Sequence, residues 1–132
     1  MKSSFQYLII GALFCLPISC DKEPCELSKK YEFEGEWLWV KTTADWAPTV
    51  TPEILGHSMS LVIDSIHYTS YLNDSITAQY SYEYEELENE FGNIEEYITL
   101  ETGHKFLVTI DPMHLILSET VIDSLVWYYI RK

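Results

Sequence analysis

Four histidines are the side chains of this sequence best suited to hold a metal ion, and they stand at positions 57, 67, 104 and 114. Zinc needs three or four such ligands within about 2 Å of one point. His104 and His114 fall at opposite ends of a predicted hairpin, about 20 Å apart at the rise of a β-strand. His57 and His67 fall out of register across a tight turn. We therefore expect no metal site.

Seven glutamates between positions 83 and 96 are the side chains best suited to act as a general acid and a general base. Catalytic carboxylates need a pocket that raises the pKa of one of them, whereas this run is typical of a solvated charged surface. The sequence also has no G-x-S-x-G motif, no catalytic Cys–His pair and no phosphate-binding glycine loop. We expect no catalytic residues, no cofactor and no enzyme activity.

The segment 76–85 has the clearest alternation of the chain, with apolar and aromatic residues on one face and Thr, Gln, Ser and Glu on the other. Such a period of two predicts a β-strand with one buried face. We expect the aromatic face to point inward. Its members are Ile76, Ala78, Tyr80, Tyr82 and Tyr84.

Three tyrosines of that strand, Tyr80, Tyr82 and Tyr84, allow two interpretations. Buried tyrosines supply a large apolar area together with hydroxyls that need partners. They would either fill the interior of the domain or line a pocket for an amphipathic ligand, such as a lipid fragment or a glycan. In the second case Trp46, on a long predicted loop, would be the lid residue.

An Asp-Ser-aliphatic pattern occurs three times, with its serines at Ser65, Ser75 and Ser124. Each occurrence falls at a predicted turn or at the start of a strand. The pattern resembles the acceptor motif of a bacterial O-glycosylation system that acts on exported proteins. It is equally typical of turns, because Asp and Ser side chains form hydrogen bonds that stabilise them.

Short strands with hairpin-length connections account for most of the chain from residue 33 onward, and no long helical pattern intervenes. This is typical of an all-β sandwich or barrel and argues against a parallel βαβ architecture. The pattern predicts eight strands, over 35–41, 57–64, 66–72, 76–85, 94–100, 104–110, 114–118 and 124–132.

Two segments do not follow this pattern of short strands and short turns. The first, 45–56, is a long connection in which Thr51-Pro52-Glu53 suits the cap and first turn of a short helix. In the second, Tyr84, Leu87 and Phe91 are spaced by three and four residues. That spacing predicts either one or two turns of helix or an acidic loop with buried apolar points.

The first predicted strand opens with Gly35-Glu36-Trp37, and the last one ends with Arg131. A G-x-W motif at the start of an eight-stranded β domain resembles the lipocalin and calycin families. The resemblance implies an eight-stranded antiparallel up-and-down barrel over 33–132, similar to small lipocalin-like lipoproteins of Gram-negative bacteria. It also implies that Gly35, Trp37 and Arg131 are structural residues, with the guanidinium stacked on the indole to close one end of the barrel.

The first twenty residues have the layout of a secretory signal, with Lys2, an apolar run over 5–16 and Cys20 at the expected cut. The apolar run is too short to span a bilayer. This segment resembles the lipobox of bacterial lipoproteins, which implies that 1–19 is a signal peptide and Cys20 carries lipid. The polar run over 20–32 is then a flexible tether.

Charge and cysteine content narrow the expected partners and location. Without Lys2 the chain has 7 basic and 21 acidic residues, a net charge of −14. Nucleic acid is therefore not an expected partner, because it needs a basic patch. Cys25 would remain as a single thiol, which leaves no intrachain disulfide but allows intermolecular pairing. We expect an outer-membrane lipoprotein of the cell envelope that faces either the periplasm or the surface.

These features lead to two hypotheses for function. In the first, the lipid-anchored barrel binds a small hydrophobic or amphipathic ligand between the 45–56 loop and the three tyrosines. In the second, a filled barrel without a small ligand acts as a protein-interaction module or inhibitor at the envelope. An exposed apolar patch around Trp46 would favour the second hypothesis.

Overall fold

The computed structural model describes residues 32–121 and 123–132. The predicted signal peptide, the predicted lipidation site Cys20 and all but the last residue of the predicted tether lie outside these described residues. Within the described part, no helix is long and apolar enough to cross a bilayer.

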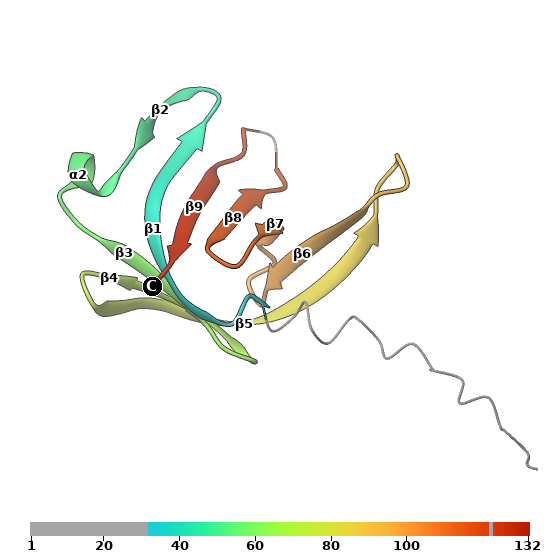
Figure 1. Ribbon diagram of the computed structural model, residues 1–132, viewed down its shortest axis with the longest axis horizontal. Helices are drawn as coiled ribbons and strands as arrows, with labels where there is room; N and C mark the ends of the chain where they lie inside the picture. Colours follow the sequence, from blue (N-terminus) through green and yellow to red (C-terminus); the bar gives the residue numbers. More distant parts are fainter. Residues whose placement is uncertain (1–31, 122) are drawn as a thin grey trace, which may run out of the picture.

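The described chain forms nine β-strands and a single short helix (Figure 1). In chain order these elements are β1 (Gly35–Ala44), β2 (Ala47–Val50), α2 (Pro52–Leu55), β3 (Met59–Ile63), β4 (His67–Leu72), β5 (Ser75–Glu88), β6 (Ile94–Leu100), β7 (Lys105–Ile110), β8 (His114–Glu119) and β9 (Val126–Arg131).

Every neighbouring pair of strands is antiparallel, and from β3 onward each strand lies beside the next one in the chain. The sheet closes because β9 returns to pair with β1, from Trp37–Arg131 at one end to Thr43–Val126 at the other. The predicted fold class is thus confirmed: the protein is all-β, with a closed eight-stranded antiparallel up-and-down barrel of lipocalin-like architecture. Closure also leaves few unpaired strand edges.

Alternation along the strands places one face of each strand in the barrel interior. Trp37 and Trp39 of β1 are buried, as are Leu61 and Ile63 of β3. Full burial of one aliphatic side chain contributes about 1.5–3 kcal/mol to stability. The buried hydrophobic core consists of Phe33, Trp37, Trp39, Leu61, Ile63, Tyr68, Ile98, Leu100, Phe106, Val108, Leu115, Leu117 and Tyr129.

The segment 45–56 contains more structure than its sequence predicts. The short helix is present as α2, which begins at Pro52. The strand β2 was not predicted, since Pro48 lies inside it. It forms because Val50 and Ala47 pair with Thr42 and Ala44 at the end of β1. A tertiary pairing therefore overrides the local sequence signal.

The prediction of helical turns over Tyr84–Phe91 is wrong, because most of this segment belongs to a β-strand. The end predicted for the fourth strand is also wrong. Strand β5 continues to Glu88 and pairs with β6 over seven residue pairs, as far as Glu88–Ile94. Phe91 lies in the turn and is 79% exposed. The spacing by three and four is thus incidental, because cross-strand pairing determines this conformation.

The expected inward face of 76–85 needs one correction, at Ile76. The register between β4 and β5 shifts there, since Ser70 pairs with Ala78 whereas Tyr71 pairs with Ile76. Thr77 is the extra residue, as in a β-bulge, and it reverses the alternation before it. Ile76 is consequently 61% exposed instead of buried.

Arg131 closes the end of the barrel at which β1 begins and β9 ends. Its guanidinium carbon lies 4.1 Å from the centre of the Trp37 ring. Its Nε donates to the Pro112 carbonyl at 2.8 Å, and its two Nη atoms donate to the Glu34 and Glu32 carbonyls at 3.1 and 2.9 Å. One side chain therefore joins the start of the described chain, the β7–β8 turn and the last strand. We call this the closed end.

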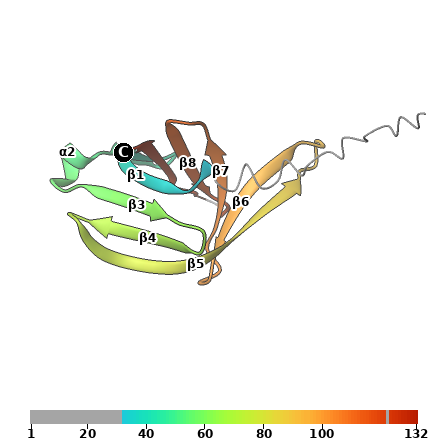
Figure 2. The same cartoon turned by 60° about the horizontal axis from the view of Figure 1, so that its bottom comes forward.

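Gly35 allows the Arg131 guanidinium to lie close to the backbone at the start of β1. Its φ is +138°, and a Cβ built on it would lie 2.7 Å from an Arg131 Nη atom. A side chain here would meet both backbone strain and a clash. At the opposite end of the barrel lie the turns after β1, β4 and β6 and the β8–β9 loop (Figures 1 and 2). We call this the open end.

We predict that Arg131→Lys lowers the free energy of unfolding by about 2 kcal/mol. An ammonium cannot serve three carbonyls in the fixed geometry of the guanidinium fork, so half-buried carbonyls lose their donors. Chemical denaturation measures this change. Lys132→Ala is the matched control, because Lys132 forms an exposed pair with Glu36 at 3.4 Å and should cost less than about 1 kcal/mol. Equal effects of the two substitutions would contradict the assignment.

Candidate ligand-binding site

A cavity of about 370 Å³ lies at the open end of the barrel. Strands β3, β4, β7 and β9 contribute most of its wall, and the small side chain of Ser70 leaves room among larger ones. The volume falls within the range of natural small-molecule pockets. The cavity is lined by His57, Met59, Ser60, Tyr68, Ser70, Tyr71, Leu72, Thr77, Phe106, Trp127 and Tyr129.

Tyr68 and Tyr129 form the inner part of this cavity. Both side chains are almost fully buried, and their hydroxyl groups interact with each other. Phe106 stacks on Tyr68 with ring centres 6.4 Å apart. Burial raises the pKa of Tyr68 to about 12 and that of Tyr129 well above its ordinary value. The inner part is therefore aromatic and uncharged at neutral pH.

Trp127 contributes both apolar surface and an unusual polar group. Its indole Nε1 is buried and finds no acceptor among the described residues. Such an unsatisfied donor costs about 1–3 kcal/mol. The indole of Trp39 contrasts with it, since its Nε1 donates to the Thr42 hydroxyl at 2.9 Å.

The loops around the mouth of the cavity carry exposed apolar side chains. Trp46, in the turn between β1 and β2, is 66% exposed, and its Nε1 donates to the Asp123 carbonyl at 3.2 Å. Ile54 of α2 and Val121 of the β8–β9 loop are similarly exposed. The predicted lid residue thus lies at the open end, tied to the neighbouring β8–β9 loop.

The three predicted tyrosines of β5 face the interior and pack against the core as partly buried side chains. They do not line the open-end cavity. The Tyr82 hydroxyl donates to the Asp64 carbonyl at 2.7 Å, and burial raises its pKa to about 12. Tyr84 packs on Phe33, with ring centres 5.1 Å apart. Tyr82 and Tyr84 therefore belong to the closed half of the barrel, and ligand binding by the three remains a prediction.

None of the residues that line the open-end cavity was predicted as a ligand-binding residue, and these include the aromatic residues Tyr68, Trp127 and Tyr129. The signal was available in the alternation of 66–72, where Tyr68, Ser70 and Leu72 fall on one face. The contribution of β9 could not be predicted in the same way, because only its pairing with β1 shows which of its consecutive aromatic residues point inward.

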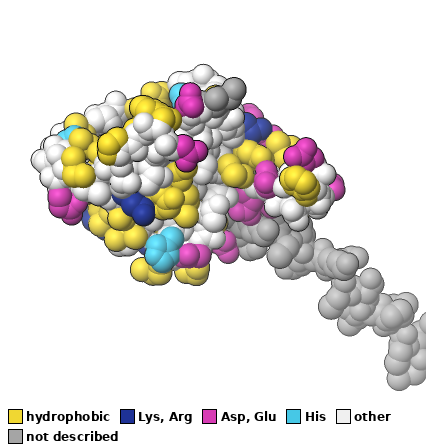
Figure 3. All heavy atoms as spheres, turned by 90° about the horizontal axis from the view of Figure 1, so that it is seen from above, with side chains coloured by type: hydrophobic (Ala, Val, Ile, Leu, Met, Phe, Trp, Pro, Cys, Tyr) yellow, Lys and Arg dark blue, Asp and Glu magenta, His cyan; other side chains and the backbone are white. Residues whose placement is uncertain are grey.

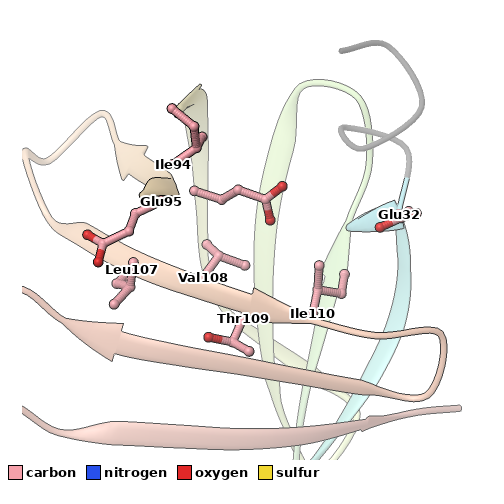
Figure 4. A pocket seen from close by; sticks show the side chains of 8 residues that line it. Glu32, Ile94, Glu95, Leu107, Val108, Thr109 and Ile110 are labelled. Atoms are coloured by element: carbon pink, nitrogen blue, oxygen red, sulfur yellow. The ribbon is translucent and has the colours of Figure 1, made fainter. Parts of the chain in front are cut away.

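A second, shallower cavity of about 450 Å³ lies near the closed end, between β6 and β7 (Figure 4). Val108 and Ile110 point to one side of β7 and Leu107 points to the other (Figure 4). Ile94 and the acidic residues Glu32, Glu95 and Glu96 complete the lining. Tyr84 lies nearby, with its hydroxyl 2.9 Å from Glu86 and 3.2 Å from Glu96. The two cavities thus differ in chemistry, since the first is aromatic and the second is acidic at its edges.

The histidines are dispersed over the barrel in the structure as well. His114 lies 2.9 Å from the Asp111 carboxylate, His67 lies 3.6 Å from Asp64, and His104 lies 3.7 Å from Glu119. Within 32–121 and 123–132, no three His, Cys, Asp or Glu side chains are grouped so as to hold a metal ion.

The aspartates of the three Asp-Ser patterns have features that are typical of turns. An Asp64 carboxylate oxygen accepts from the backbone N–H groups of Ile66 and His67 at 2.7 and 2.6 Å, which lowers the pKa of Asp64. Asp74 and Asp123 both adopt a φ of 66°. Ser65 and Ser75 are exposed and Ser124 is partly buried. Glycosylation of these serines remains a prediction.

Comparisons of the chain with protein-family models, with curated proteins and with solved structures found no significant match.

We predict that the phenol of Tyr68 ionises near pH 12 in the folded protein, because burial disfavours the phenolate. Below the ordinary pKa of 10 its contribution to stability is complete, and this contribution is lost as the pH rises from 10 towards about 12. Ultraviolet titration of the wild type against Tyr68→Phe isolates this group, and the unfolded protein provides the reference. A difference centred at pH 10 in the folded protein would show a solvated phenol and contradict the assignment.

Proposed function

We propose that this protein is a lipid-anchored lipoprotein of the cell envelope whose lipocalin-like barrel binds a small hydrophobic or amphipathic ligand. The observation that carries the proposal is the aromatic cavity of about 370 Å³ at the open end of a closed barrel. We propose a binding role without enzyme activity.

The chemistry of the lining supports a largely apolar ligand. Met59, Leu72 and Phe106 offer apolar contacts, and Tyr68 and Tyr129 add aromatic surface that is uncharged at neutral pH. Apolar burial contributes roughly 25 cal/mol per Å² of surface, before the costs of association. A ligand of this kind would gain its affinity from shape and burial, with few polar contacts. The polar rim at His57 and Thr77 would suit an amphipathic head group.

The position of Glu32, where the described chain begins, supports one orientation of the barrel at a membrane. Glu32 is held at the closed end by Arg131, while the cavity opens at the other end. If Cys20 carries lipid, the eleven residues between Cys20 and Glu32 span at most about 40 Å. The membrane anchor would then be attached to the end of the barrel opposite the mouth, so that ligands could enter from the aqueous side.

A second function, a protein-interaction module, is favoured by the exposed apolar side chains at the open end. Trp46 and Ile54 are 66% and 67% exposed. Exposed aromatic residues of this kind are typical of interaction surfaces. In this alternative the partner protein would contact the loops of the open end, and the cavity would carry no cargo.

We predict that Ser70→Leu weakens binding of the neutral dye N-phenyl-1-naphthylamine at least tenfold. Ser70 faces the cavity, and the larger side chain would occupy the space that the dye needs. Titration of the dye, whose fluorescence rises in apolar surroundings, measures the affinity.

Ser118→Leu is the matched control, since it makes the same change on the opposite face of β8 from the buried Leu117. It should leave the dye affinity within twofold. Circular dichroism melting of both variants checks that they remain folded. Dye binding that is equal in the wild type and in Ser70→Leu would contradict the proposed site, and absence of binding to any of them would favour the interaction module.

A further inference from the structure

The hairpin formed by β5 and β6 projects from the barrel beyond its neighbours (Figures 1 and 2). Strand β5 pairs with β4 only as far as Ser81, and its remaining residues pair with β6 alone. Apart from Glu96, which pairs with Val108 of β7, the outer part of this hairpin, residues 83–96, therefore has strand edges that neighbouring strands of the barrel do not cover. We call these residues the arm.

Strands β6 and β7 separate where the arm leaves the barrel wall. Their pairing runs from Thr99–Lys105 to Glu96–Val108 and goes no further in the described part of the chain. Ile94 pairs with β5, and Ile110 pairs with β8. The cavity of about 450 Å³ occupies this wedge, with Glu32 on its far side from Ile94 (Figure 4).

The arm combines acidic and exposed apolar side chains, as Figure 3 shows for the projecting hairpin at its right. Residues 83–96 include seven glutamates and no lysine or arginine in their sequence. The nearest lysine in the sequence, Lys105, pairs with Glu85 at 2.6 Å. Leu87, Phe91 and Ile94 are 41%, 79% and 58% exposed. A surface of this composition attracts cations while offering apolar contacts.

The negative charge of the arm excludes two kinds of binding partner at this surface. A second copy of the chain carries the same net charge of −13 and would bring two acidic arms together. An anionic membrane would be repelled in the same way. An extended segment that alternates basic and aliphatic residues fits this surface. Its basic residues match the acidic side chains, its aliphatic residues match the aliphatic lining, and its backbone can pair with the uncovered strand edges.

We propose that the wedge between β6 and β7 binds an extended, basic and aliphatic segment of a partner protein by β-strand addition. In this mode the backbone of the added strand pairs with a sheet edge, and alternate side chains supply specificity. The strand would lie along Ile94 and Glu95, with its aliphatic side chains against Ile94 and Ile110, which share one face of the sheet. Its lysines or arginines would face Glu32 and the outer glutamates of the arm. This interaction is independent of the open-end cavity.

The test uses the full-length protein in detergent and a ten-residue peptide that alternates lysine and valine. Two control peptides replace every valine by serine or every lysine by glutamate. We expect the Lys–Val peptide alone to slow amide hydrogen exchange at Ile94 and Ile110, whose N–H groups are directed away from β5 and β8 and towards the wedge. Binding of the Lys–Ser peptide with equal affinity would show plain charge attraction and overturn the proposal.

Charge-reversal variants locate the site. Glu88→Lys with Glu90→Lys on the arm should weaken Lys–Val binding at least tenfold. The matched control, Asp45→Lys with Glu53→Lys at the open end, changes the net charge equally and should weaken it less than threefold. Equal weakening by both pairs would overturn the proposal, as would protection of amides elsewhere.

One further variant distinguishes a partner from the chain itself. Lys29 and Lys30 precede Glu32 closely in the sequence. If the peptide binds only after both lysines are replaced by glutamate, the chain's own segment is the natural occupant and the partner proposal fails. Binding to the unmodified protein supports the proposal.

Discussion

The stacking of Arg131 on Trp37 is the interaction on which the rest of this structure depends. The guanidinium lies 4.1 Å from the indole centre and donates to carbonyls of Glu32, Glu34 and Pro112. These contacts join the two ends of the described chain next to the pairing of β1 with β9. A barrel exists only if its first and last strands meet, and this cluster reinforces at one end the closure that the six residue pairs between β1 and β9 provide.

Closure at one end has a direct consequence for the other. The entering chain and Phe33 fill the closed half, where Tyr84 packs on Phe33. The open half holds smaller side chains such as Ser70, so that space remains between the larger aromatic residues. One barrel therefore has a filled half that stabilises the fold and a hollow half available for binding. The acidic wedge lies outside this interior, so the two surfaces can bind different molecules without competing.

Much of the fold is predictable from the sequence, because alternation and turn residues are local signals. Eight strands, the short helix at Pro52 and the all-β class follow from them. What could not be predicted depends on pairing between distant segments. The strand β2 forms only against the end of β1, and the bulge at Thr77 turns Ile76 outward through a register shift with β4. The predicted tyrosines are inward, but the cavity uses Tyr68 and Trp127, which only the closed register brings together.

Native mass spectrometry of the protein extracted from its own membrane tests the central claim, that the open-end cavity holds a small ligand. The account predicts a reproducible extra mass on the folded protein that is lost on denaturation, is separable from any covalent lipid and is absent from Ser70→Leu. A folded wild-type protein that carries no extra mass, or an extra mass that Ser70→Leu retains in full, would contradict the account.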